Sequence, residues 1–274
     1  MKMRPGNKKK AAMLLLAAFL VSALTACGDV SFETASVRAV SALTEAENVH
    51  ADVSVEVAAT ASILGEELPM SASAAVSMDT DGANASGRIS LDAFGTSYAA
   101  DYASVKSGEG CDLYISLDGG EVWTKQAAVS RDELKESIGS LDPDISSMLE
   151  FYVEFAGGFS KPVAETCSGV ECLRYDGVLP GDKLSEALSM SGGSALAELT
   201  DGTVMPDAPV SRWFAREGFL PVRVSVDMTE AVGRYVTGAL AGSWAPEGLV
   251  RVDSVTVDVE LGGYGESAPE VPGT

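Results

Sequence analysis

Apolar and polar residues alternate with a period of two along most of the chain. Val53, Val55 and Val57 alternate with Ser54 and Glu56. The same alternation returns at 72–78, 113–117, 222–228 and 255–261. Successive side chains of a strand point to opposite faces, so each stretch predicts a strand with one apolar and one polar face. Such strands are typical of an antiparallel sheet that buries a single side.

Short stretches with helical spacing interrupt this pattern. A loose apolar stripe predicts a helix within 29–51, and Ser130 with Glu133 forms a capping box that opens another. A third helix is expected to begin at the N-cap candidate Asp144 and to stop at Gly157. Two more short helices are expected at 181–190 and 229–240. The chain therefore combines many strands with few helices, which indicates the α+β class.

Glycine, proline and aspartate mark the connections between the expected strands. The stretch Asp118–Gly120 predicts a hairpin before Trp123, and Gly218–Pro221 divides another hairpin over 211–228. A segment rich in Gly, Ser and Pro at about 190–208 predicts an irregular insert.

Strands with only one apolar face need a cover for that face. A flat sheet would need a second sheet, whereas this sequence offers a few short helices. We therefore expect a strongly curved antiparallel sheet, a half-barrel whose concave face is covered by helices and need not be filled completely. Because no repeat and no linker divides the chain, residues 35–274 are expected to form a single domain.

The first 26 residues have the composition of a signal peptide. A basic segment, "MKMRPGNKKK", precedes the apolar run "AAMLLLAAFLVSAL", and "LTAC" ends at Cys27. This order is typical of a bacterial lipoprotein signal, so we expect lipid chains such as palmitate on Cys27 and a tether over 27–34. A plain secretory signal and a short membrane anchor are the alternatives, although a spanning helix needs about 20 apolar residues. The predicted location is the extracytoplasmic face of the cell membrane.

The charge of the chain restricts its partners. The sequence has 19 basic and 40 acidic residues, and residues 1–26 contain five of the basic ones and no acidic one. The mature chain thus keeps 14 basic residues against 40 acidic ones, a formal net charge of −26. Such a surface repels nucleic acid and anionic lipid headgroups at long range. We expect a monomer that binds no nucleic acid and meets the membrane through its anchor.

Three cysteines remain once Cys27 is assigned to lipid. Cys167 and Cys172 flank a Ser-Gly pair in "CSGVEC", and a hairpin turn would bring them close together. An extracytoplasmic location permits a disulfide here. Two free thiols are an equal alternative, because a loop this short gains little stability from a bond. Cys111 is expected to be a small buried hydrophobe.

Reactive side chains are sparse. His50 is the only histidine, and we expect it at the surface near a helix end. The sequence contains no Gly-x-Ser-x-Gly elbow. The acidic pairs in "DTDG" and "DPD" lack the bidentate glutamate of a calcium loop, and no His or Cys spacing fits zinc. With 40 acidic residues, close carboxylate pairs arise by chance and do not indicate a glycosidase. We expect no enzymatic activity, no metal and no cofactor.

Large apolar side chains gather in the central strands and in the helices that follow them. They are Phe94, Tyr98, Tyr114, Trp123, Met148, Phe151, Tyr152 and Phe155. Ordinary core packing is one interpretation of each. The other is that several line an apolar ligand cavity, with Met148, Tyr152 and Phe155 as its lid.

Five stretches, in their order along the chain, carry a family resemblance. They are "LTAC" before an amphipathic helix, "DLYISLDGGEVWTK", "CLRYDGVLPGDKLSEAL", "RWFAREGFLPVRVSVDMT" and the tail "VDSVTVDVELGGYGESAPEVP". In this order the chain resembles the LolA/LprG-like superfamily of bacterial lipoprotein carrier domains, especially its single-domain lipoproteins from Gram-positive bacteria. The resemblance covers most of residues 32–272 outside the insert.

The resemblance implies a half-open β-barrel that encloses an apolar cavity for acyl chains or lipid-anchored cargo. The predicted function is therefore that of a membrane-anchored lipoprotein that binds or transfers a lipid or other hydrophobic molecule at the cell surface. A non-enzymatic interaction or envelope-sensing module, built on the same scaffold with a filled core, is the alternative. Packing of the interior separates the two, because a carrier needs space that a filled core lacks.

Overall fold

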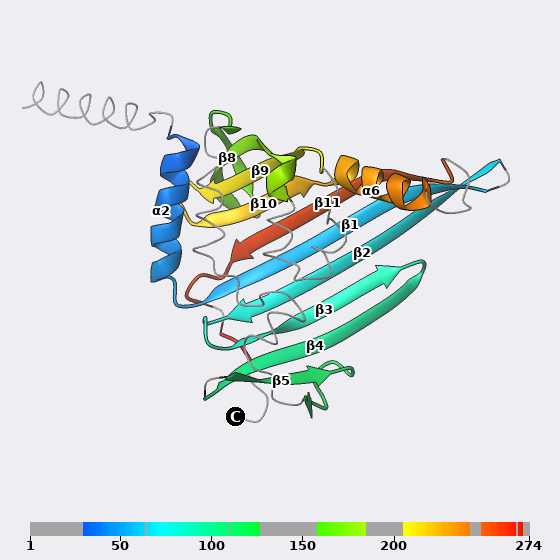
Figure 1. The fold of residues 1–274 in the computed structure, drawn as a ribbon. Coiled ribbons are helices and arrows are strands. Elements are labelled where there is room, and N and C mark those ends of the chain that lie inside the picture. The colour runs from blue at the N-terminus through cyan, green and yellow to red at the C-terminus, as the bar shows by residue number, and fades with distance from the viewer. Residues whose placement is uncertain are drawn as a thin grey trace, which may run out of the picture.

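One antiparallel sheet dominates the fold (Figure 1). The structure is a computed structural model that describes residues 30–63, 65–108, 110–126, 158–184, 205–241, 248–266 and 268–270. In this part of the chain the sheet has eleven strands, and two helices lie wholly within the described ranges. The sheet twists and curves, and all of its strand pairs are antiparallel. The predicted class, a curved antiparallel sheet with helices, is confirmed.

The sheet consists of two meanders that meet in its middle. The first comprises β1 (Val49–Ile63), β2 (Glu66–Thr80), β3 (Ala85–Ala93), β4 (Thr96–Ser107), β5 (Gly110–Ser116) and β6 (Thr124–Lys125). The second comprises β7 (Val163–Cys167), β8 (Val170–Leu179), β9 (Ala208–Ala215), β10 (Pro221–Asp227) and β11 (Val250–Gly262). Strands β1 and β11 pair and join the meanders, while β6 and β7 form the two edges. The described sheet is therefore open.

Both helices, α2 (Phe32–Glu45) and α6 (Thr229–Ala241), lie on the same face of the sheet. Helix α2 packs against Tyr175 and Phe214, and α6 packs against Val255. Alternation along the paired strands places these three side chains on one face. We call this side the helix face and the other side the polar face.

Helix α2 begins where its N-cap is satisfied. The side chain of Ser31 accepts a hydrogen bond from the backbone N–H of Thr34 (3.3 Å). Its buried residues recur at helical spacing and form a stripe: Phe32, Ala35, Ser36, Ala39 and Leu43. The Phe32 ring stacks on Phe159 with centroids 3.7 Å apart, and the Tyr175 hydroxyl donates to the Val30 carbonyl (2.8 Å). These contacts fix α2 over β8 and β9.

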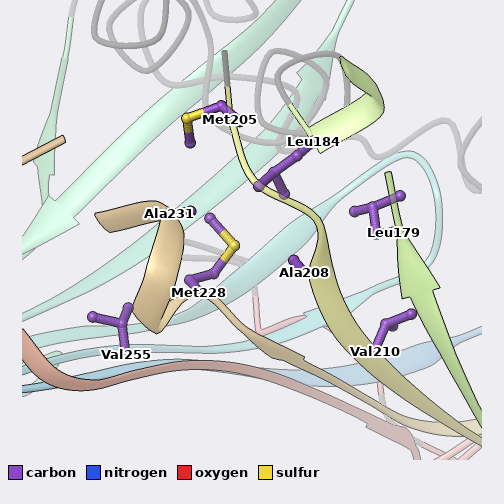
Figure 2. Packing of buried hydrophobic residues seen from close by; sticks show 8 residues of the cluster. All are labelled: Leu179, Leu184, Met205, Ala208, Val210, Met228, Ala231 and Val255. Atoms are coloured by element: carbon purple, nitrogen blue, oxygen red, sulfur yellow. The ribbon is translucent and has the colours of Figure 1, made fainter. Parts of the chain in front are cut away.

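Helix α6 covers the second buried cluster of the helix face. Figure 2 shows Met228 and Ala231 facing Leu184 and Met205, with Val255 beneath the helix. The cluster also contains Leu179, Ala208 and Val210. The first turn of α6 is fixed to β11, because the Thr229 hydroxyl accepts a hydrogen bond from the backbone N–H of Val255 (2.9 Å).

Paired charges cover the polar face. Arg223 lies 2.7 Å from Asp258 across β10 and β11, and its guanidinium also lies 5.4 Å from the Trp213 ring centroid. Further cross-strand pairs are Arg174–Glu165, Arg88–Asp101 and Lys125–Asp112. Cross-strand neighbours of opposite charge stabilise a sheet modestly. This face is therefore built for solvent.

His50 belongs to this polar face and lies in β1, not at a helix end as its sequence position suggested. Its Nδ1 is 2.8 Å from Asp79, and its Nε2 is 3.1 Å from Asp52. Burial by itself would lower the pKa of His50. The hydrogen bonds with Asp79 and Asp52 and the charges of both carboxylates outweigh burial and raise the pKa above 6.5.

Most elements follow the sequence pattern, with shifted boundaries. The helix within 29–51 ends at Glu45, because Val49 already pairs in β1. Residues 88–105 supply parts of two strands, and the strand after the Asp118–Gly120 turn begins at Thr124. The helix at 229–240 is confirmed as α6. The expected helices that open at Ser130 and Asp144 lie outside the described residues, as do most of 181–190 and of the insert.

Gly87 is required by the close pairing of β2 and β3, which gives a first prediction. A Cβ at this position would lie 1.9 Å from the carbonyl oxygen of Ser77. Gly87→Ala is expected to lower the free energy of unfolding by about 2–3 kcal/mol in urea denaturation, as overpacking does. Gly238→Ala is the control, because Gly238 lies in α6 and a Cβ there would meet no atom within 4 Å. It should stabilise by about 0.5–1 kcal/mol, and equal effects of the two changes would contradict the assigned register.

The carboxylates around His50 give a second prediction. Because the folded state raises the His50 pKa above its unfolded value of 6.5, the stabilisation is complete below that value and is lost as pH rises through the folded pKa. The side chain is 32% exposed, so the effect should stay within about 0.2–1 kcal/mol. In urea denaturation, the free energy of unfolding of wild type should exceed that of His50→Gln by more at pH 6 than at pH 8. A pH-independent difference would show that the imidazole does not become charged here.

Candidate functional site: an apolar floor on the helix face

Two adjacent rows of apolar side chains cross the helix face, and we call them the apolar floor. The first row runs over six strands: Ala100, Ile89, Val76, Val53, Val259 and Val224. The second row lies one pleat further along the same strands: Tyr98, Leu91, Ala74, Val55, Val257 and Val226. Valine and isoleucine suit this pleated surface because β-branched side chains pack well on strands.

The floor is less buried than its surroundings. Ile89 and Leu91 are each 44% exposed and Tyr98 is 65% exposed, while the other nine members are only partly buried. The two clusters under α2 and α6, in contrast, contain fully buried side chains. The clusters under both described helices therefore lie over β8 to β11, where Val224, Val226 and Val257 of the floor pack against the cluster under α6. The exposed part of the floor lies on β3 and β4. A contiguous apolar surface of this kind marks a place where an apolar partner binds.

The first row ends in a buried cation. In β9 and β8 it continues from Val224 to Arg212 and Tyr175. Arg212 is 3% exposed, and its guanidinium lies 6.0 Å from the Phe32 ring centroid. It is the only charged side chain in these two rows of the described sheet. A buried arginine is held by partners, so it sets a fixed charge at the α2 end of the floor.

A third row lies next to the first row of the floor, on the side away from the second row, and is more deeply buried. It contains Tyr102, Gly87, Met78 and Ala51. Tyr102, Met78 and Ala51 form a buried cluster with Ala85. Burial, together with the charge of Asp79, raises the pKa of Tyr102 to about 12. The phenol therefore stays protonated at physiological pH.

The structure brings one of the predicted ligand-binding aromatics into the floor. Tyr98 pairs with Leu91 in the second row. Phe94 lies in the turn between β3 and β4 with φ of 52° and is 78% exposed. Its side chain therefore stands at the rim of the sheet, beyond the last residue of β3.

Two further predicted aromatics, Tyr114 and Trp123, lie outside the floor. Tyr114 points to the polar face, where its ring lies 5.8 Å from the ammonium group of Lys125. Trp123 is partly buried in the loop before β6. Met148, Phe151, Tyr152 and Phe155 lie outside the described residues, as does Cys27.

Sequence reasoning missed the residues that form most of the floor. They are the aliphatic side chains of β1, β2, β3 and β11, and the signal that identifies them is the alternation itself. The sequence prediction favoured aromatic residues, whereas Val53 and its neighbours look like ordinary core residues in the sequence. The structure shows that these aliphatic side chains are only partly buried. Their common face requires the register, which the sequence does not state.

The two neighbouring cysteines pack on the polar side of β7 and β8. Cys167 and Cys172 are buried thiols in one cluster with Val222. Cys167 pairs with Val170, so the cysteines are diagonal neighbours, a wider spacing than the 3.5–4.5 Å typical between the Cβ atoms of a disulfide. Burial, and then the neighbouring Cys167, raises the pKa of Cys172, which keeps its thiol protonated. Cys111 is buried, as expected.

The described ranges offer no other chemical centre. In them no group of three or more His, Cys, Asp or Glu side chains is arranged to hold a metal ion. Among the helices of the same ranges, none is long and apolar enough to cross a membrane. The floor is thus the candidate site, and what it offers chemically is contact with an apolar molecule.

Comparison with known proteins adds names but no family assignment. No protein-family model and no curated protein matches the chain. Among solved structures, a DUF1329 family protein from Desulfovibrio piger shares 11% identity over 88% of this chain and 95% of that chain, with a TM-score of 0.22. A LolA superfamily protein from Nitrosomonas europaea shares 10% over 89% and 96%, with a TM-score of 0.23. A putative outer membrane lipoprotein-sorting protein domain from Vibrio parahaemolyticus shares 12% over 86% and 94%, with a TM-score of 0.21.

The second and third of these names agree with the resemblance in the sequence. Identities and TM-scores this low carry no argument about function. The fold therefore rests on the sheet of this chain, an open antiparallel sheet with both described helices on one face.

Proposed function

We propose that the protein is a lipid-anchored, non-enzymatic binding protein that holds a lipid or other apolar molecule on its apolar floor. The bound molecule would lie across β3, β2, β1 and β11, beside the clusters under α2 and α6. The proposed location is the extracytoplasmic face of the cell membrane, with Cys27 as the anchor.

The exposure of the floor is the observation that carries this proposal. Burial of apolar surface contributes about 25 cal/mol per Å² in water. A face that needed no partner would gain solubility from polar residues, as the opposite face of the same strands shows with Ser73, Ser77 and Arg88. The chain instead has aliphatic side chains at eleven of the twelve neighbouring positions, and Tyr98 occupies the twelfth. An apolar ligand supplies the missing contacts.

The position of α2 supports a site close to the membrane. Cys27 precedes the N-cap Ser31 by four residues, which span at most about 14 Å when extended. The anchor would therefore hold the α2 end of the sheet near the bilayer. With a net charge of −26, the mature domain is repelled by anionic headgroups, so the anchor rather than the surface would keep it there.

Binding of a hydrocarbon probe tests the floor. The mature protein without its lipid is expected to bind diphenylhexatriene, with a rise in fluorescence. Leu91→Asn should weaken this binding about fivefold, because a half-exposed leucine gains about 1 kcal/mol from further burial. Val178→Asn is the matched control: Val178 is 47% exposed but lies on the polar face, so its change should leave binding unaltered.

Two results would overturn the proposal. One is wild-type protein that does not bind the probe, together with no lipid found by mass spectrometry of an organic extract of the purified protein. The other is an equal loss of binding in Leu91→Asn and Val178→Asn. Either result would favour the interaction or sensing module with a filled core.

The anchor is tested separately. Cys27→Ala in the full chain should move the protein from the membrane fraction to the medium or the soluble envelope fraction, because no acyl chain is then attached. Metabolic labelling with a palmitate analogue should mark wild type and not the variant. Retention of the variant in the membrane fraction would show that another segment anchors the chain.

A further inference from the structure

Two buried thiols lie together on the polar face, on the opposite side of the sheet from the apolar floor. Cys167 ends β7 and Cys172 lies in β8, on either side of the two-residue turn formed by Ser168 and Gly169. Both thiols are free and buried, and they share one cluster with Val222. The backbone N–H of Cys167 also forms a hydrogen bond with the sulfur of Cys172. The two thiols are therefore neighbours in an enclosed apolar pocket.

The spacing of these thiols suits a bridging ion better than a direct bond. Cys167 pairs with Val170 and Cys172 pairs with Glu165, so the cysteines are diagonal neighbours on one face of the hairpin. Diagonal Cβ atoms of an antiparallel pair are wider apart than the distance of about 3.5–4.5 Å in a disulfide. Two sulfurs that each bind one ion at about 2.3 Å can lie about 4.6 Å apart. An ion between the thiols can thus span a distance that is too wide for an unstrained disulfide.

The number of ligands restricts the kind of ion. Within the described residues, no third His, Cys, Asp or Glu joins the two thiols in a group that could hold a metal. Glu165, opposite Cys172, is engaged by Arg174 (3.0 Å) and by the indole N–H of Trp213. Zinc and calcium need more ligands than two, whereas soft ions such as Cu(I) prefer thiolates and accept two of them. The pair therefore suits a soft monovalent ion.

The surroundings of the thiols can accept the charge of such a complex. Each thiol loses its proton when it binds a metal, so one Cu(I) replaces two protons and leaves one net negative charge, with no transfer of electrons. Arg223 lies close enough to Cys167 to interact with it electrostatically. Its guanidinium is also 5.4 Å from the ring centroid of Trp213, which packs against the thiol cluster. A cation and an aromatic ring thus lie beside the two sulfurs.

The turn between β7 and β8 is the route by which an ion would enter. The Ser168 hydroxyl lies 3.9 Å from the sulfur of Cys167 and donates a hydrogen bond to Glu260 of β11 (2.9 Å). The turn is thereby held over the polar face. Because β7 is an edge strand of the described sheet, opening this turn would expose the thiols without breaking the pairing of the other strands.

We infer that Cys167 and Cys172 together bind one soft monovalent metal ion, for which Cu(I) is the model, as a two-coordinate dithiolate. This site lies on the other face from the apolar floor, so it does not depend on the proposed binding of an apolar molecule.

Competition for Cu(I) with the chelator bicinchoninate tests the ligands. The Cys27→Ala chain is the starting protein, because its remaining cysteines are Cys111, Cys167 and Cys172. After reduction it should bind one Cu(I) per chain. Cys167→Ser and Cys172→Ser should each weaken binding by about 100-fold or more, since losing a ligand costs more than losing an outer-sphere partner. Cys111→Ser is the matched control, because Cys111 is also buried but lies in β5, and it should bind Cu(I) like the starting protein.

Equal losses in all three variants, or no loss in Cys167→Ser and Cys172→Ser, would overturn the inference. Circular dichroism should show that each variant is folded before its binding is compared. Two measurements on the starting protein need no change at these thiols. X-ray absorption of the Cu(I)-loaded chain should find two sulfur neighbours, and a coordination shell without sulfur would rule the site out. A disulfide between Cys167 and Cys172 in protein purified without reductant would show that the thiols lie within bonding distance, which also overturns the inference.

Discussion

The pairing of β1 with β11 is the interaction on which the rest of the structure depends. It aligns twelve residues of β1 with β11, from His50 opposite Gly262 to Ala61 opposite Val250. The two strands lie at opposite ends of the described fold in sequence, and every other neighbouring pair in the sheet belongs to one meander or the other. Without this pairing the chain would form two smaller sheets. The floor would then be divided between Val53 and Val259, at the centre of its first row.

The same pairing explains why the two faces differ so sharply. Period-two alternation continues across β1 and β11, so Val53, Val55 and Val57 face the helices while Asp52, Ser54 and Glu56 face the other way. The polar face then satisfies its own charges through pairs such as Arg223 with Asp258. Stability therefore comes from the seam, the paired charges and the clusters beneath the helices.

The alternation in the sequence predicts which residues face the helices, but only within each strand. It identified Val53 to Val57 and Val255 to Leu261 as one-sided strands, and the structure places them next to each other. It could not show that these strands pair, because their partners are about 200 residues apart. It also assigned Tyr114 to the candidate site, whereas the β4–β5 register turns this ring toward Lys125. The helical pattern likewise predicted a first helix that extends past His50. In the structure this helix ends earlier, and Val49 already pairs with Thr80 in the sheet.

Side-chain size shapes the floor further. On β2 the floor residues are Ala74 and Val76, whereas β3 supplies Leu91 and Ile89 beside them. Smaller side chains on the inner strand lower the surface there relative to the larger ones nearer the edge. A chain selected only for a dense core would fill that place, because unfilled contacts cost stability. This lower aliphatic surface on β2, beside the larger side chains of β3, is where the proposed ligand would lie.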